Sequence, residues 1–243
     1  MNYSVIIPAR YESSRLPGKP LVDLLGIPMI IRTYQQCAKA CDTNNIYVAT
    51  DDERIKIICQ EHNINVLMTS KNCLTGTDRV AECMNYLDSE VFINVQGDEP
   101  LFNPEDLKIM IRKAQEFPNE ILNGYCEIIS EKDFRSRSIP KVVFRPDNKL
   151  LYMSRGTIPN NKNNEFLKAW RQVCVYAFPR NALKSFNEKK EKTPLESLED
   201  IEILRFLELG HEVRMIKLSN QSIAVDNPSD VQKVITELRK INN

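Results

Sequence analysis

The first hundred residues alternate short apolar runs with stretches of helical spacing, and no other feature constrains the fold of the chain as strongly. The apolar runs that predict strands lie at residues 3–7, 45–50, 66–68 and 91–95. Between them, apolar side chains recur every three or four residues, as on one face of a helix, in the stretches 30–41, 55–59 and 77–87. Strands and helices that alternate in this way form βαβ units around a mostly parallel sheet.

We therefore expect an α/β fold with a Rossmann-like, mostly parallel central sheet flanked by helices. The second half is less regular, with strands predicted at 121–129, 141–145, 150–153 and 173–178 and helices at 198–209 and 229–241. No linker rich in Pro, Gly or Ser divides the chain. Residues 1–243 are therefore expected to form a single domain, in which roughly 121–190 contribute a smaller, mixed α+β lobe.

The composition is that of a soluble globular protein without a nucleic-acid or membrane partner. Lys and Arg together number 33, as do Asp and Glu, and this balance argues against a broad surface for nucleic acid. No apolar run approaches the roughly 20 residues that span a bilayer, and the N-terminus lacks the basic start of a secretory signal. The seven cysteines include no C-x-x-C pair, so a zinc site is unsupported. Cys37, Cys41, Cys59 and Cys83 fall on the apolar faces of predicted helices, which indicates small buried side chains in a reducing compartment. A cytoplasmic location is expected.

A basic loop follows the first predicted strand. The segment 7–20, IPARYESSRLPGKP, places Arg10, Arg15 and Lys19 close together, with Gly18 beside the lysine. Guanidinium groups, an ammonium and exposed backbone N–H groups suit a triphosphate, because it concentrates several negative charges in a small volume. The loop lacks the G-x-x-x-x-G-K-[ST] pattern of a P-loop. It predicts a different kind of phosphate site, in preference to a surface turn with scattered charges.

Two acidic segments are candidates for holding a divalent metal ion. Asp98 follows the predicted strand 91–95 in the sequence NVQGDEP, where its carboxylate can reach the carboxyl edge of the sheet. Its neighbour Glu99 is expected to point elsewhere, since side chains alternate along an extended chain. Asp226, in the sequence AVDNPSD, precedes the last predicted helix. For Asp98 a structural role in a turn or cap explains the sequence equally well. For Asp226 the sequence by itself favours a structural role in a turn, with Ser229 or Asp230 as the helix cap.

The sequence TGTDR at 75–79 opens the third predicted helix. Thr77 can cap this helix, and Gly76 lets a ligand approach the backbone closely. Main-chain groups together with Arg79 could therefore contact a nucleotide base. An ordinary capped helix start explains the same residues equally well.

Taken together, the segments IPARYESSRLPGKP, TGTDR, NVQGDEP, SRGTIP and AVDNPSD resemble, in this order, the motifs of the 3-deoxy-manno-octulosonate (Kdo) cytidylyltransferases. The resemblance runs from about Ser4 to Val234. It implies a fold of the nucleotide-diphospho-sugar transferase type and a homodimer formed through the smaller lobe. It also implies transfer of CMP from CTP to the anomeric hydroxyl of a 3-deoxy-2-ulosonic acid, with release of pyrophosphate and Mg²⁺ as cofactor. The product would enter lipopolysaccharide or surface polysaccharide biosynthesis.

The resemblance further implies roles for residues that match the family's motifs. The catalytic, phosphate-facing cations would be Arg10, Arg15 and Lys19. The nucleotide would be bound by Ala9 through its backbone, Arg10, Lys19, Thr77 and Arg79. The Mg²⁺ ligands would be Asp98 and Asp226. The sugar acid would be contacted by Gln96, Arg155, Gln172, Tyr176, Glu202 and Ile203, with Arg155 suited to a bidentate contact with the carboxylate.

The chain departs from the family's pattern at three positions. Cys73, Gln172 and Ile203 stand where the family usually has histidine, histidine and glutamine. The last two fall where the sugar would sit, and they change which hydroxyls can be paired. The resemblance therefore implies Kdo or a close relative, such as a variant with an amino group.

Two other functions remain alternatives. A metal-dependent glycosyltransferase of similar fold would carry D-x-D after a strand, where this chain has Gln96-Gly97-Asp98. Such an enzyme also has no use for the basic loop, because no pyrophosphate leaves. A paralogue that binds CTP without turnover would account for the altered sugar residues, but the chain retains the cations and both aspartates.

Overall fold

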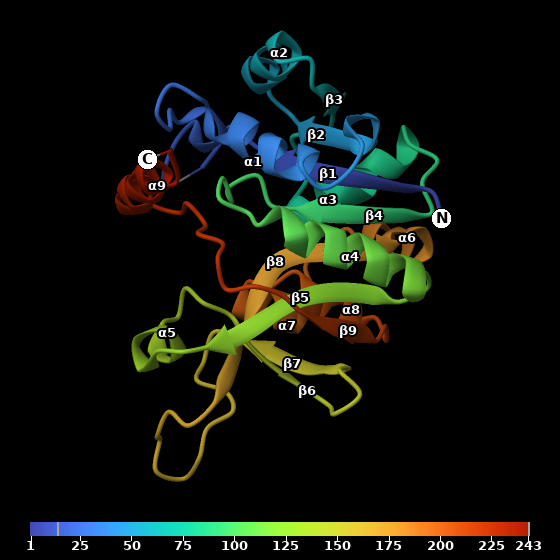
Figure 1. Cartoon of the computed structure of the whole chain (residues 1–243). Coiled ribbons are helices and arrows are strands. Elements are labelled where there is room, and N and C mark those ends of the chain that lie inside the picture. The colour runs from blue at the N-terminus through green and yellow to red at the C-terminus, as the bar shows by residue number, and fades with distance from the viewer. Residues whose placement is uncertain (14, 243) are drawn as a thin grey trace. The chain divides into compact units, whose positions relative to one another are not determined.

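The computed structural model describes residues 1–13 and 15–242 (Figure 1). The chain forms two compact units, which are considered one at a time below. The first unit comprises Met1–Lys108 and Gln221–Asn243, and the second comprises Ile109–Asn220. Among the described residues, no helix combines the length and the apolar character needed to cross a membrane.

The first unit contains four parallel strands in the order β3-β2-β1-β4. They are β1 (Tyr3–Ala9), β2 (Ile46–Thr50), β3 (Asn65–Met68) and β4 (Val91–Val95). Its helices are α1 (Met29–Ala38), α2 (Glu53–Glu61), α3 (Gly76–Glu82) and α9 (Pro228–Asn242), with short 3-10 turns η1 (Lys19–Leu21), η2 (Thr43–Asn45) and η3 (Cys83–Asn85). The helix α4 (Pro104–Glu116) begins in this unit and ends in the next. The mostly parallel sheet flanked by helices is as predicted.

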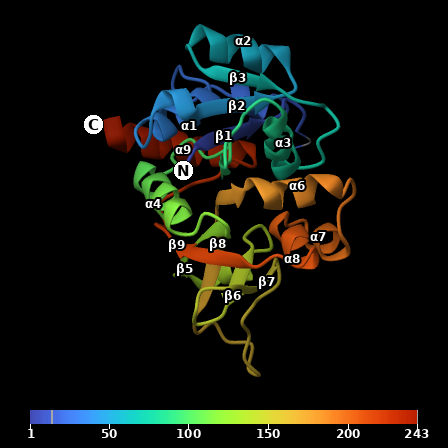
Figure 2. The same ribbon diagram turned by 90° about the vertical axis from the view of Figure 1, so that its right-hand side faces the viewer.

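Helices cover both faces of this parallel sheet, which explains why its strands are mostly apolar. The side chains of Ile30 in α1 and Ile7 in β1 both lie against Gly97, so α1 packs on the face of the sheet to which Ile7 points. Gly76 of α3 instead lies against Pro8, whose side chain points to the opposite face because neighbouring strand residues alternate. Figure 2 shows α1 and α3 on the two sides of the sheet.

The start of α3 corrects one prediction. The cap is Thr75, which has the extended backbone that a cap requires and accepts a hydrogen bond from the N–H of Asp78 at 3.2 Å. Thr77, the predicted cap, lies inside the first turn and is buried. The helix starts one residue earlier than predicted, so Thr77 already has helical geometry.

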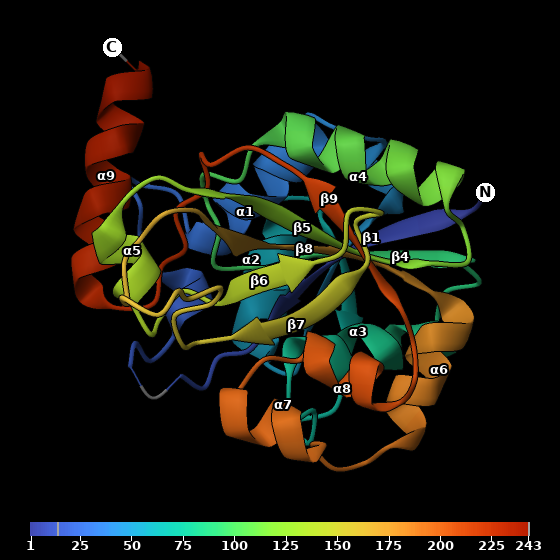
Figure 3. The ribbon, with the colours of Figure 1, turned by 90° about the horizontal axis from the view of Figure 1, so that it is seen from below.

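The second unit is built around a mixed sheet (Figure 3). Its strand β5 (Ile121–Ile128) pairs antiparallel with β8 (Ala169–Pro179) and parallel with β9 (Val213–Lys217). The hairpin of β6 (Lys141–Phe144) and β7 (Leu150–Ser154) joins through β6 to β8. The helices of this unit are α5 (Glu131–Arg135), α6 (Arg180–Glu188), α7 (Pro194–Glu199) and α8 (Ile203–Glu208).

The helix predicted over 198–209 is wrong, because the chain forms two short helices there. Asp200, between α7 and α8, has a left-handed backbone with φ of 51°, which a continuous helix cannot contain. The two helices are joined by a buried ion pair in which Arg205 Nε lies 2.6 Å from Glu196 Oε2. The guanidinium also stacks on the ring of Phe186 in α6. These contacts stabilise the break in the helix.

Candidate functional site

The basic loop and the first acidic segment begin at the same edge of the first unit's sheet. β1 and β4 are parallel neighbours, so the residues after Ala9 and those after Val95 leave the sheet side by side. Gly97 allows the two segments to come close. A Cβ atom at this position would lie 2.7 Å from the carbonyl oxygen of Pro8, a distance that real Cβ atoms do not show. A glycine is therefore required where the acidic segment crosses the end of β1.

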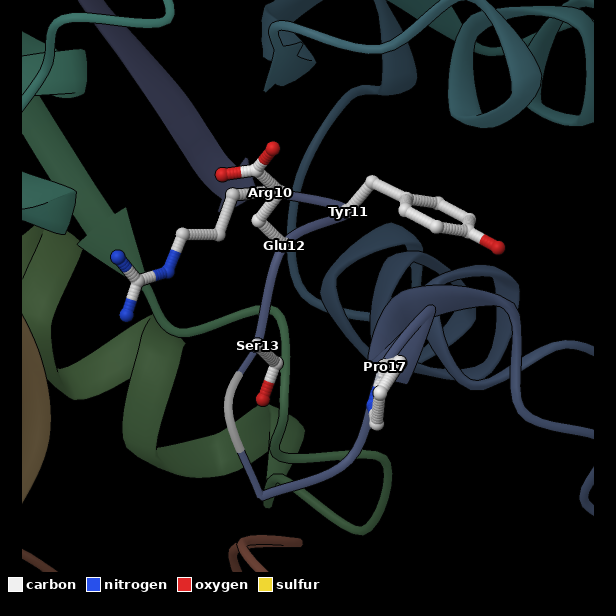
Figure 4. Close-up of a pocket in the computed structure, with 5 residues that line it drawn as sticks. All are labelled: Arg10, Tyr11, Glu12, Ser13 and Pro17. Atoms are coloured by element: carbon white, nitrogen blue, oxygen red, sulfur yellow. The ribbon is translucent and has the colours of Figure 1, made fainter.

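The basic loop closes on itself between Tyr11 and Gly18. The N–H of Gly18 donates to the carbonyl of Tyr11 at 3.1 Å, and Gly18 has a φ of 68°, in the region that glycine adopts without strain. The guanidinium of Arg54, from α2, stacks on the ring of Tyr11 at 3.3 Å. The loop borders a cavity of about 480 Å³, in which Arg10 and Tyr11 point to opposite sides (Figure 4). The residues around the cavity are Arg10, Tyr11, Glu12, Ser13 and Pro17.

Two of the three predicted cations contact the predicted metal ligands. Lys19 Nζ lies 2.6 Å from Asp98 Oδ2 and 3.5 Å from Asp226 Oδ1. Arg15 Nη2 lies 2.9 Å from the same oxygen of Asp226. The structure thus brings together four residues that the sequence analysis selected separately. Arg10 is exposed, and within the described part of the chain no hydrogen bond or ion pair to its guanidinium is found.

The two aspartates have the position and chemistry to share one cation. Their carboxylate oxygens both contact the single ammonium of Lys19, although 127 residues separate them in the sequence. The side chains are partly open to solvent, with exposed fractions of 24% for Asp98 and 36% for Asp226. Carboxylate oxygens are the ligands that Mg²⁺ prefers. No cluster of three or more His, Cys, Asp or Glu suited to a metal occurs among the described residues, so water and phosphate oxygens would complete the coordination, as is common for Mg²⁺.

The side chain of Arg79 has protein partners. It is 3% exposed, and its Nη2 lies 2.9 Å from Asp51 Oδ2 while its Nη1 donates to the hydroxyl of Thr69. Asp51 follows β2 and Thr69 follows β3, so the guanidinium joins α3 to the ends of two strands. Such a pair positions the start of α3. Asp51 and Thr69 are both polar residues directly after predicted strands, where ligands of a parallel sheet bind, but the sequence by itself gave neither of them a role.

The predicted residue Gln96 lies against the start of α3. A Cβ atom built on Gly76 would be 3.5 Å from both amide atoms of Gln96. Gln96 is half-buried, and it belongs to the first unit together with the cations and aspartates. The remaining sugar candidates all lie in the second unit.

In the second unit, Gln172 and Tyr176 of β8 form a buried polar network with Asn123 of β5. Asn123 Nδ2 donates to the carbonyls of Val173 and Val175 at 3.1 and 3.0 Å. Carbonyls only accept, so the orientation of the Asn123 amide is determined and its Oδ1 must accept from Gln172 Nε2, at 3.0 Å. Gln172 Nε2 also donates to the Tyr176 hydroxyl at 3.2 Å. The side-chain oxygen of Gln172, Oε1, is an acceptor that has no hydrogen-bond partner among the described residues.

Arg155 holds the end of β7 to the turn between α7 and α8. Its Nε donates to the carbonyl of Glu199 at 2.6 Å and its Nη2 to the carbonyl of Asp200 at 2.9 Å. The Glu199 carboxylate accepts in return from the backbone N–H of Arg155 and the hydroxyl of Ser154. Burial opposes ionisation of Glu199, but these hydrogen bonds outweigh it and lower the pKa of the carboxyl. A substrate carboxylate would have to share the Arg155 guanidinium with these backbone partners.

The last two sugar candidates lie at the start of α8. Glu202 is the residue before this helix and Ile203 is its first residue. Ile203 is 1% exposed and belongs to the hydrophobic core, so it offers no surface to a ligand in this structure.

A second buried cation in this unit was not selected from the sequence. Lys141, on β6, donates to the carbonyls of Ser136, Ile139 and Arg155 at 2.7, 2.8 and 2.8 Å. Burial lowers the pKa of this ammonium. All three of its donors are satisfied by backbone oxygens, which indicates a structural role.

A parallel α/β sheet that presents cations and paired carboxylates beyond its strand ends defines a nucleotide-binding α/β protein. A family model described as cytidylyltransferase matches residues 4–217, and the chain belongs to this family.

Relatives across the whole chain support this membership. The chain is 37% identical over 242 residues to the mitochondrial 3-deoxy-manno-octulosonate cytidylyltransferase of Arabidopsis thaliana, covering 98% of this chain and 83% of the relative. It is 38% identical over 239 residues to the 8-amino-3,8-dideoxy-manno-octulosonate cytidylyltransferase of Shewanella oneidensis, covering 96% and 97%.

Solved structures of cytidylyltransferases have a similar fold. A structure of CMP:2-keto-3-deoxy-manno-octonic acid synthetase complexed with CTP matches with a TM-score of 0.92 and 31% identity, over 99% of this chain and 100% of the other. A cytidylyltransferase of Leptospira borgpetersenii, at 15% identity and a TM-score of 0.62, covers 100% of this chain and 95% of its own, and shares the fold.

Proposed function

We propose that this protein transfers CMP from CTP to the anomeric hydroxyl of a 3-deoxy-2-ulosonic acid and releases pyrophosphate. The observation that supports the proposal is the contact of Lys19 with both Asp98 and Asp226, residues that would bind a triphosphate and its metal ion. Relatives named for Kdo and for its 8-amino counterpart, at 37% and 38% identity, support this class of sugar acid as substrate.

The basic loop supplies the charge that binds the triphosphate. Arg10, whose guanidinium is exposed, and Arg15 and Lys19, which pair with the carboxylates in the ligand-free protein, would bind phosphate oxygens. Asp98 and Asp226 would hold Mg²⁺, which when bound neutralises phosphate charge and orients the triphosphate. With the charges held in place, catalysis depends on position and electrostatics more than on covalent chemistry.

In the reaction, the anomeric oxygen of the sugar acid forms a bond to the α-phosphorus of CTP. The bond from that phosphorus to the pyrophosphate oxygen breaks, and the sugar hydroxyl loses its proton. The second unit would bind the sugar acid through Gln172, Tyr176 and the exposed part of Arg155. Gln172 offers a hydrogen-bond acceptor whose orientation is determined by Asn123.

The proposal includes a homodimer in the cytoplasm. The second unit exposes several large apolar side chains, which a partner subunit would cover. They are Ile129, Leu151, Leu167 and Leu198. The equal numbers of acidic and basic residues give no reason to expect a charged macromolecular partner.

The test is pyrophosphate release in the presence of Mg²⁺, each nucleoside triphosphate in turn, and a panel of ulosonic acids that includes Kdo and its 8-amino form. Release that requires both CTP and a sugar acid supports the proposal. Hydrolysis of a nucleotide sugar in place of this reaction would indicate a glycosyltransferase. Tight CTP binding without any pyrophosphate would indicate a binding paralogue.

A further inference from the structure

Glu99, the acidic neighbour of Asp98, has a separate place in the first unit. Asp98 points toward Lys19, whereas Glu99 is 5% exposed and its Oε2 accepts a hydrogen bond from the hydroxyl of Ser222. A carboxylate so deeply buried is unfavourable unless its oxygens are hydrogen-bonded. The burial of Glu99 and its hydrogen bond with Ser222 indicate a role beyond the formation of a turn.

Ser222 belongs to a segment without helix or strand, residues 221–226, which we call the return segment. This segment runs along the residues after β4 and contacts them at several points. The N–H of Val225 donates to the carbonyl of Asp98 at 2.9 Å, and the amide of Asn103 donates to the side chain of Gln221 at 3.3 Å. The return segment ends at Asp226, the second candidate metal ligand.

The side chains of the return segment divide between polar anchors and the core. Val225 is fully buried in an apolar cluster with Met29 of α1 and Val234 of α9, and Ile223 packs against the same cluster. The backbone N–H groups of Asp226 and Asn227 both donate to Asp230 Oδ2, at 3.2 and 3.0 Å. The backbone of Asp226 is therefore held from its C-terminal side by the first turn of α9.

The contact at Ser222 holds the other end of the segment. Val225 and Ile223 fix the middle of the segment in the core, and the hydrogen bonds of Ser222 and Gln221 fix its N-terminal end, so its direction is determined. The direction decides whether the Asp226 carboxylate reaches the same cation as Asp98, because neither aspartate is held to the other directly. Asp98 and Glu99 are adjacent, so one short segment contributes a carboxylate and also positions the other.

We infer that Glu99 and Ser222 are positioning residues that set the separation of the Asp98 and Asp226 carboxylates, and so the affinity of the site for a divalent cation. The inference rests on the proposed function, in which these two carboxylates bind the metal that accompanies CTP. Removal of groups that orient metal ligands characteristically costs metal affinity while the ligands themselves remain.

The experiment measures free Mn²⁺ by electron paramagnetic resonance as it is titrated into the full-length protein with CTP and without a sugar acid. Ser222→Ala is expected to raise the Mn²⁺ dissociation constant about tenfold. Ser222→Thr retains the hydroxyl and is expected to restore the wild-type value. Glu99→Gln, which keeps the shape but not the charge, is expected to weaken Mn²⁺ binding as Ser222→Ala does.

The matched control is Ser89→Ala. Ser89 shares a buried hydroxyl hydrogen bond of 2.7 Å with Ser4 in the same unit, away from the carboxyl ends of the strands. The Ser89→Ala variant should lower the melting temperature about as much as Ser222→Ala does, but it should leave the Mn²⁺ dissociation constant unchanged.

If Ser222→Ala binds Mn²⁺ like the wild type, or if Ser89→Ala weakens it equally, the inference is overturned while the proposed function stands. CTP itself binds Mn²⁺, so CTP without protein is the reference. If the wild type with CTP binds no more Mn²⁺ than this reference, the proposed function fails and the inference fails with it.

Discussion

The candidate site residues of the two units are held in opposite ways. In the first unit the cations and aspartates form ion pairs that are open to solvent, with side-chain exposures of 18% for Lys19 and 58% for Arg15. In the second unit Asn123, Gln172 and Tyr176 form a neutral network that is buried and held by backbone carbonyls. Solvent-exposed ion pairs are weak and can exchange partners, which suits a multiply charged ligand. A buried neutral network keeps a defined geometry, which suits recognition of particular hydroxyl or amino groups.

The strongest test of the charged region is Asp98→Ala. Loss of a metal ligand is expected to lower kcat by about 10³-fold, because metal stabilisation of phosphate charge is worth several kcal/mol. The measurement is the rate of pyrophosphate release at saturating CTP and sugar acid. Asp88→Ala removes an exposed aspartate before β4 and should keep the wild-type rate. Near-normal turnover by Asp98→Ala would show that the first unit's carboxylates do not hold a catalytic metal.

The next largest effect concerns stability and belongs to the second unit. Glu196 and Arg205 are both fully buried, so Glu196→Ala leaves an unpaired buried guanidinium and is expected to destabilise the protein by about 3–5 kcal/mol. Arg15→Met, which breaks an exposed pair with Asp226, is expected to change stability by less than about 1 kcal/mol. Denaturant unfolding measures the free energy of unfolding of both variants. Equal losses of free energy would contradict the contrast between buried and exposed ion pairs.

Lys19→Met tests whether the ion pairs of the first unit exchange. The ammonium of Lys19 competes with a metal for both carboxylates, so its removal is expected to tighten Mn²⁺ binding without nucleotide about fivefold, the equivalent of roughly 1 kcal/mol. CTP binding should weaken in the same variant. Arg15→Met should have a smaller effect on Mn²⁺, since Arg15 contacts Asp226 alone. Weaker Mn²⁺ binding by Lys19→Met would mean that Lys19 organises the carboxylates instead of competing for them.

The smallest expected effect tests the neutral network. Gln172→Met keeps the size of the side chain but removes its acceptor, and is expected to lower kcat/KM for the sugar acid about threefold, which lies within the range for one hydrogen bond. KM for CTP should not change. Gln60→Met, an exposed glutamine in α2, is the control. If KM for CTP rises as well, Gln172 stabilises the fold and does not bind the sugar acid specifically.

Residue type and order predicted the parallel sheet and the charged cluster, because both depend on local patterns. Apolar runs at 91–95 and elsewhere became strands within one or two residues, and the charges of Arg15, Lys19 and Asp98 indicated a phosphate and metal site before any contact was known. The predictions failed where distant residues decide the outcome. The helix over 198–209 breaks at Asp200, and Arg205 of the second part pairs with Glu196 of the first inside the core.

The amino-acid order alone thus determined the strands and helices of the first hundred residues, the family motifs and the kinds of charge that lie beyond β1 and β4. It did not determine which partner each charged or polar group would have. Arg79 pairs with Asp51, and Glu99 pairs with Ser222, 123 residues away, because folding brings these segments to one edge of the sheet. Hydrogen bonds act over about 3 Å, so a pairing between distant residues depends on the three-dimensional path of the backbone.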